Sequence, residues 1–196
     1  MSNLYNTLYD NNDNSHTNSS DIGMEIINQL HGHLDFETVS SYYDIMTYNK
    51  LFESQQTSVL NVMHINSRSL PRNFDSIKSL LKTLHTQPDV LVFTETWLTH
   101  NNRDHYELLG YHSYHLVRNT RRQGGVSVFV SNNFFSKDLK ELTIINNDIE
   151  INTVSIKTNS VNFFLCSIYR PNSKHIAVEE FTDLLNRLLQ DIAKNK

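Results

Sequence analysis

The sequence has little cysteine, proline or glycine: one, three and five of its 196 residues, respectively. Because Cys166 has no partner for an intramolecular disulfide, the disulfide-stapled extracellular domains are excluded. No apolar run approaches the ~20 residues that a membrane-spanning helix needs. The first apolar cluster, residues 22–30, has no basic stretch before it. We expect an intracellular protein, nuclear or cytoplasmic, that is not secreted and has no membrane partner.

Positive charge is also scarce, since 17 Lys and Arg face 21 Asp and Glu and give a net charge of −4. A global basic field of the kind that attracts nucleic acids is therefore absent, and any contact with DNA has to be local. The sequence also lacks a G-x-x-x-x-G-K-S/T loop, a G-x-G-x-x-G loop and a G-x-S-x-G elbow. Their absence argues against P-loop, dinucleotide-binding and serine-hydrolase functions.

The chain divides into three predicted parts. Residues 1–21 are mostly polar and predict a disordered tail. Residues 22–56 contain weak helical patterns at 24–30 and 39–51 and predict an accessory helical lead-in. From there on, residues 57–196 predict the core domain.

The core domain opens with a strand, a helix and a strand. The apolar run at 59–65 predicts a buried strand, and so does the run at 89–95. Between them lies an amphipathic helix that Asn73 or Asp75 is expected to cap, with Phe74, Ile77, Leu80, Leu81 and Leu84 on one face. This order predicts a right-handed parallel crossover.

The rest of the chain predicts antiparallel strands and a final helix. The combination indicates an α/β fold with a mixed sheet. The expected strands are 111–117, 126–131, 142–145, 151–156 and 163–169, and the expected helix is 181–192.

Two polar residues stand where the first two strands end. Asn66 could bind a phosphate oxygen or orient a metal ligand, or it could simply form an Asx-turn. Glu95 follows an apolar strand, where a carboxylate is costly unless a cation or hydrogen bonds compensate it, although it could also be an ordinary loop residue. Active sites of open α/β sheets lie at such strand ends.

Further candidates lie near the later strand ends. Tyr169 could donate its hydroxyl to a phosphate with Arg170 adding charge, or it could be a rim aromatic before Pro171. Arg118, Arg121 and Arg122 could contact a DNA backbone or belong to a solvated turn. Cys166, within an apolar run, is better explained as a small buried side chain than as a nucleophile.

Several short motifs occur in an order that resembles the endonuclease/exonuclease/phosphatase superfamily, and specifically the apurinic-type endonuclease of non-LTR (LINE, jockey-like) retrotransposons. Each motif is weak alone, but their joint order and spacing are specific. They are HINSRSL at 64–70, NFD at 73–75, TETWL at 94–98, GGV at 124–126 and IYRPN at 168–172, with YYDI at 42–45 and NKLF at 49–52 resembling the family's lead-in.

The resemblance implies a two-sheet, DNase I-like α/β sandwich with flanking helices that hydrolyses phosphodiesters with Mg²⁺ or Mn²⁺. It makes Glu95 a metal ligand, Asn66 a residue that helps to place the metal or phosphate, and Tyr169 a phosphate contact. DNA is the implied partner. The substrate-binding candidates are then Arg68, Arg118, Arg121, Arg122, Arg170 and Asn172.

The chain also departs from the family pattern, because neither the Gly-Asp-Phe-Asn nor the Ser-Asp-His strand end occurs in it. Since groups that act as a unit fail together, we expect no appreciable cleavage by this chain alone and only weak metal binding. We also expect the C-terminal portion of the fold to be missing, and with it the second sheet that covers the first. The uncovered face would favour self-association.

Two other functions stay open. A non-catalytic module could bind DNA or a protein through the arginines and strand-end loops, and salt-sensitive DNA binding without metal dependence would indicate it. A phosphatase-branch phosphoesterase is less favoured, because it needs the same missing motifs.

Overall fold

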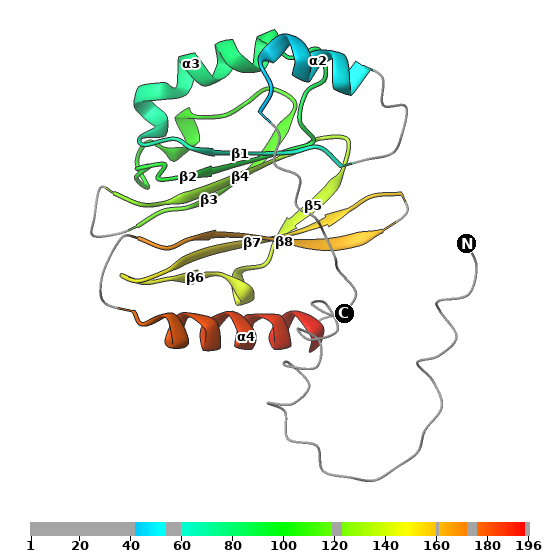
Figure 1. Cartoon of the computed structure of the whole chain (residues 1–196). Helices are drawn as coiled ribbons and strands as arrows, with labels where there is room; N and C mark the ends of the chain where they lie inside the picture. The colour runs from blue at the N-terminus through cyan, green and yellow to red at the C-terminus, as the bar shows by residue number, and fades with distance from the viewer. Residues whose placement is uncertain (1–41, 54–59, 119–122, 160, 172–175, 195–196) are drawn as a thin grey trace, which may run out of the picture. The chain divides into compact units, whose positions relative to one another are not determined.

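The computed structural model describes residues 42–53, 60–118, 123–159, 161–171 and 176–194. Within these ranges, two sheets lie between two long helices (Figure 1). The helices are α2 (Ile45–Glu53), α3 (Leu70–Thr83) and α4 (Val178–Lys194), with 3₁₀ turns η1 (Arg103–His105) and η2 (Lys140–Leu142). The strands are β1 (Val62–Asn66), β2 (Val90–Thr94), β3 (Tyr111–Leu116), β4 (Val126–Ser131), β5 (Phe135–Asp138), β6 (Ile144–Ile145), β7 (Glu150–Lys157) and β8 (Asn162–Tyr169).

The first sheet has the strand order β1-β2-β4-β3 and is mixed, as the sequence predicts. Strands β1 and β2 are parallel, with Asn66 opposite Thr94 at their carboxyl ends. Strand β4 runs antiparallel to both β2 and β3. The parallel pair joined by α3 is the predicted crossover, and it brings the ends of β1 and β2 to one edge.

The second sheet contains β5, β6, β7 and β8. Strand β7 pairs antiparallel with each of the other three. It packs on the first sheet through an apolar layer. Our expectation that the chain lacks a covering second sheet is therefore wrong, because the strands predicted at 142–169 themselves form that sheet. Self-association stays a prediction, but without the uncovered face that motivated it. The apolar layer consists of Val90, Val92, Val128 and Val130 from the first sheet and Val154 and Ile156 from the second.

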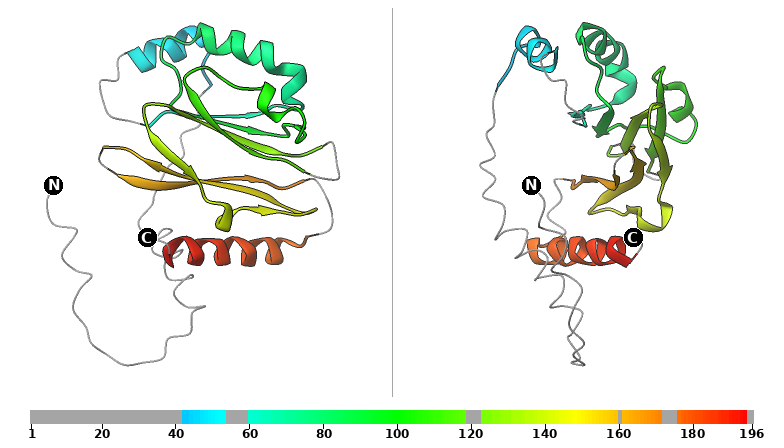
Figure 2. Two further views of the ribbon diagram at one scale, coloured as in Figure 1. Left: turned by 180° about the vertical axis from the view of Figure 1, so that it is seen from behind. Right: turned by 90° about the vertical axis from the view of Figure 1, so that its right-hand side faces the viewer.

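Helix α3 covers the outer face of the first sheet, and α4 covers the outer face of the second (Figure 2). The predicted cap of α3 is wrong, because the helix begins at Leu70 with Ser69 at its N-cap position. The ring of Pro71 suits the first helical turn, where an N–H is not needed. Asn73 instead donates from its amide to the Ser67 carbonyl at 2.8 Å.

Helix α2 packs on the core through the side chain of Asn49. Its amide donates to the Thr83 carbonyl at 2.9 Å and its oxygen accepts the His85 N–H at 3.0 Å. Helix α2 overlaps the helical pattern predicted at 39–51, whereas the pattern at 24–30 lies outside the described residues. The predicted division at residue 57 stays a prediction.

The sequence did not predict β5 or η1, and the run at 142–145 forms only the two-residue strand β6 after η2. These elements are short, and exposed and intermediate residues alternate along β5, so local patterning marks them weakly. Among the described residues, no helix is long and apolar enough to cross a bilayer.

Candidate active site at the strand ends

Two loops meet at the carboxyl ends of β1 and β2 and hold each other through backbone hydrogen bonds. The Ser67 N–H donates to the Thr94 carbonyl at 2.9 Å, and the Ser69 N–H donates to the Glu95 carbonyl at 2.8 Å. Positive φ angles occur at Arg68 (40°), Ser69 (90°), Glu95 (53°) and Trp97 (55°). Such angles are costly for residues other than glycine and persist only where the surroundings impose them.

The three residues predicted to carry the chemistry lie together at this edge. The Asn66 amide donates to Glu95 Oε1 at 2.9 Å. The Tyr169 phenol, at the end of β8, lies close enough to the same carboxylate for Glu95 to raise its pKa. Residues from three strand ends, separated by up to 103 positions in the chain, thus converge on Glu95, which stays partly exposed.

Tyr169 is held in its protonated form. Burial is the main cause that raises the pKa of its phenol, and the charge of Glu95 and the hydrogen bond to it act in the same direction. Glu150 adds a smaller effect of the same sign, which Arg118 opposes. A neutral phenol at this position can donate a hydrogen bond to an anionic oxygen.

The donor set fits a weakly held hard cation rather than a closed metal site. Within the described part of the chain, no group of three or more His, Cys, Asp or Glu could hold a metal ion. Mg²⁺ keeps several waters and often uses only one or two protein carboxylates. Glu95 supplies one carboxylate, and Asn66 lies within hydrogen-bonding distance of it.

The Gly124–Gly125 turn supports the loop that carries Glu95. The Thr96 N–H donates to the Gly125 carbonyl at 3.2 Å, and the Trp97 N–H donates to the Gly124 carbonyl at 2.9 Å. Both glycines have positive φ, +94° and +88°, which glycine adopts at little cost in a tight turn.

A buried ion pair beneath this turn was missed by sequence reasoning. Glu150 is fully buried; one of its oxygens pairs with the Arg118 guanidinium and the other accepts the Gly125 N–H at 2.6 Å. Burial raises the pKa of Glu150, while Arg118 and the Gly125 N–H oppose that shift. The only local signal was a carboxylate at the start of an apolar strand.

The arginine candidates have different environments. Arg118 is only 8% exposed at its side chain, and its pairing with Glu150 counts against the predicted DNA contact, which stays a prediction. Arg68 is exposed beside Asn66. Arg170 is exposed too, but donates to the Ile176 carbonyl at 2.9 Å and lies over the Phe181 ring. The remaining substrate-binding candidates, Arg121, Arg122 and Asn172, lie outside the described residues.

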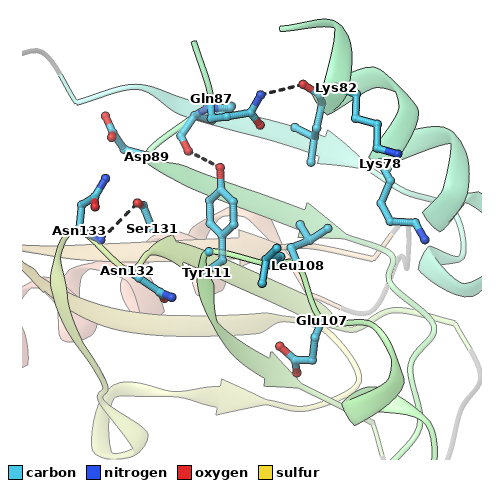
Figure 3. A pocket seen from close by; sticks show the side chains of 14 residues that line it. Lys78, Lys82, Gln87, Asp89, Glu107, Leu108, Tyr111, Ser131, Asn132 and Asn133 are labelled. Carbon is cyan, nitrogen blue, oxygen red and sulfur yellow. Dashed lines mark hydrogen bonds between the residues drawn. The ribbon is translucent and has the colours of Figure 1, made fainter. Parts of the chain in front are cut away.

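A cavity of about 710 Å³ lies away from the strand-end cluster (Figure 3). It includes Asp89, which precedes β2, whereas Glu95 follows that strand at its other end. The Tyr111 hydroxyl in its wall donates to the Pro88 carbonyl at 2.6 Å. None of the residues predicted from the strand ends lines this cavity.

Cys166 has the environment of a packed side chain. It lies against the apolar cluster between β7, β8 and α4, and burial raises the pKa of its thiol. Because the thiolate is the reactive form, we expect alkylation by iodoacetamide at pH 7.5 to be at least about tenfold slower in the folded protein than in urea. Equal rates under the two conditions would contradict this.

Comparison with known proteins gives a family and two distant structures. Residues 59–195 match the endonuclease/exonuclease/phosphatase family. The solved structure of the 3′ phosphatase NExo from Neisseria, bound to a product DNA hairpin, is 16% identical with a TM-score of 0.44, covering 69% of this chain and 53% of that one. The Xenopus laevis APE2 catalytic domain is 17% identical with a TM-score of 0.41, covering 66% and 52%.

The chain thus spans about half the length of these two solved structures. No curated protein matches it. The family match covers most of the chain and includes Asn66, Glu95 and Tyr169, the three residues that the fold brings together. The chain belongs to the endonuclease/exonuclease/phosphatase family.

Proposed function

We propose that this chain belongs to a metal-dependent, phosphodiester-hydrolysing DNA endonuclease of the type that non-LTR retrotransposons encode. The observation that carries the proposal is the meeting of Asn66, Glu95 and Tyr169, where the carboxyl ends of β1 and β2 in the first sheet lie beside the end of β8 in the second. The retrotransposon type rests on the sequence motifs HINSRSL and TETWL around the first two of these residues.

Each residue has a role that its chemistry permits. Glu95 is the ligand of Mg²⁺ or Mn²⁺, and Asn66 orients its carboxylate through the 2.9 Å hydrogen bond. A bound divalent ion would polarise a phosphoryl oxygen. Tyr169 is a neutral phenol with one O–H donor, which would turn from Glu95 to the phosphate when the cation occupies that carboxylate. Arg68, exposed on the adjoining loop, contacts the DNA backbone.

The 196-residue chain is expected to bind DNA without cutting it, because it contains neither a Gly-Asp-Phe-Asn nor a Ser-Asp-His sequence. These motifs supply the family's groups that activate water and contact the phosphate. Without them, the metal and the phenol are left without a base for the attacking water.

The test measures duplex DNA binding by fluorescence anisotropy and supercoiled-plasmid nicking, each with and without Mg²⁺. We expect Mg²⁺ to strengthen DNA binding at least about threefold in the wild type and to have no such effect in Glu95→Ala, since removing the carboxylate removes the metal site. Nicking should not exceed that of Glu95→Ala.

Glu179→Ala is the matched control, because Glu179 is an exposed carboxylate on α4. It should behave as the wild type does. DNA binding that depends on salt but ignores Mg²⁺ would contradict the proposal and favour the non-catalytic binding module. Nicking that Glu95→Ala abolishes would support the endonuclease site and overturn the expected inactivity.

A further inference from the structure

Glu150 is a fully buried carboxylate whose two oxygens have different partners. Oε2 accepts the Gly125 N–H at 2.6 Å, and Oε1 is paired with Nε of Arg118, whose side chain is 8% exposed. A buried ion pair is weak evidence for stability, because apolar side chains of similar size often serve as well. The hydrogen bond to Gly125 also ties this ion pair to the Gly124–Gly125 turn.

The Gly124–Gly125 turn connects Glu150 to the loop that carries Glu95. On one side, a Cβ added at Gly124 would lie 2.4 Å from Glu150 Oε1. On the other side, the two glycine carbonyls accept the N–H groups of Trp97 and Thr96. The Glu150 carboxylate therefore contacts the Gly124–Gly125 turn, and the turn contacts the Glu95 loop. The hydrogen bonds between turn and loop are made by backbone atoms, not by flexible side chains.

Glu150 also borders the opposite wall of the site. It is the first residue of β7 and lies directly across from Tyr169 in the register of β7 and β8. Glu95 and Tyr169 come from different sheets, so nothing within one sheet fixes the distance between them. Glu150 is in the second sheet and reaches the turn that supports the Glu95 loop of the first.

We infer that Glu150 is a positioning residue: with Arg118 it fixes the Gly124–Gly125 turn and thereby holds Glu95 in reach of Tyr169. This inference rests on the proposed function of the strand-end cluster. An ion pair with only a structural role would stabilise the fold without affecting the Glu95 loop. A folded variant without the pair would then keep a rigid loop, whereas loss of a positioning residue would loosen it.

The double variant Glu150→Leu/Arg118→Met removes the anchor while keeping apolar volume in its place. Its control is Thr153→Val, because Thr153 is equally buried on β7 and donates to the Leu142 carbonyl at 3.0 Å, away from the turn. Comparison at equal global stability, adjusted with urea, separates local from global opening.

Two measurements decide the inference. Amide hydrogen exchange at Thr96 and Trp97 should be at least tenfold faster in the double variant than in Thr153→Val, and the affinity for Mn²⁺ should fall at least fivefold. Unchanged exchange, or faster exchange with unchanged Mn²⁺ affinity, would overturn the inference. If the double variant does not fold, Glu150→Gln, which keeps the side-chain shape and loses one acceptor, should shift both readouts in the same direction, and no shift would overturn it.

Failure of the proposed function has a different signature. If the wild type shows no Mn²⁺ binding that depends on Glu95, the metal site is wrong, whereas the exchange measurement still reports whether Glu150 holds the loop. Accelerated exchange would then support the anchor alone, and unchanged exchange would overturn it.

Discussion

Replacing Glu150 by leucine alone is expected to lower the free energy of unfolding by about 3–5 kcal/mol, the usual cost of removing one partner of a buried ion pair. The substitution leaves the Arg118 guanidinium, which cannot lose its proton, buried without a counter-ion. It also leaves the Gly125 N–H without its acceptor. Urea unfolding followed by far-UV circular dichroism measures the change.

Adding Arg118→Met to Glu150→Leu should recover more than half of the lost stability, because the unpaired charge is then gone. The single and double variants therefore separate the cost of a lone buried charge from the worth of the pair. Equal stability of the two variants would contradict the account, since it would mean that the Arg118 guanidinium reaches solvent or another anion.

Replacing Gly125 by alanine is expected to cost about 2 kcal/mol or more, from two sources. The residue has φ +88°, which an L-amino acid adopts at a cost. Its new methyl group would also lie 2.4 Å from Thr96 Oγ1 and 3.4 Å from the Leu116 carbonyl. The Thr96 side chain or the loop backbone that carries it has to move to make room. Urea unfolding again measures the cost.

Gly110 provides a matched control for this substitution. It has φ +89°, but an added Cβ would meet nothing within 4 Å. Gly110→Ala should therefore cost about 1 kcal/mol, from the backbone alone. As a second control, adding Thr96→Ala to Gly125→Ala should recover part of the stability that Gly125→Ala loses beyond the cost of Gly110→Ala. Equal costs at the two glycines would contradict a tight contact between the turn and the loop.

The strand ends were predictable because their signals are local. An apolar run followed by a polar residue marks the end of a buried strand, and the parallel crossover then requires Asn66 and Glu95 to lie at one edge. Tyr169 was a candidate at its own strand end, but its place beside Asn66 and Glu95 followed only from the family resemblance, since it depends on how the second sheet packs. The structure places all three together.

Glu150 and Arg118 could not be predicted in the same way. They lie 32 residues apart, and each alone is an ordinary charged residue beside a strand. Only the packing of β7 against the Gly124–Gly125 turn buries both. Similarly, the helix start at Leu70 depends on Ser69 having φ +90°. The hydrogen bonds that Ser69 and Leu70 donate to carbonyls of the neighbouring loop impose this angle, rather than a local capping signal.

The expected absence of the second sheet was an error of a different kind. Its strands were predicted from their own patterns, at 142–145, 151–156 and 163–169, but were assigned to one sheet with the earlier strands. The valines of β2 and β4 pack against Val154 and Ile156 of β7 across an apolar layer, so the residues that each strand buries are covered by the opposite sheet. Alternation within a strand shows which residues are buried, not which partner buries them.

If the proposed function is right, Glu95 is the ligand of a divalent cation beside Asn66 and Tyr169. The most direct test is a Mn²⁺ titration followed by electron paramagnetic resonance, on the wild type, Glu95→Ala and Glu179→Ala. We expect one weak site in the wild type and in Glu179→Ala, and at least a tenfold loss of affinity in Glu95→Ala. Equal Mn²⁺ binding by all three proteins, or none by the wild type, would contradict it.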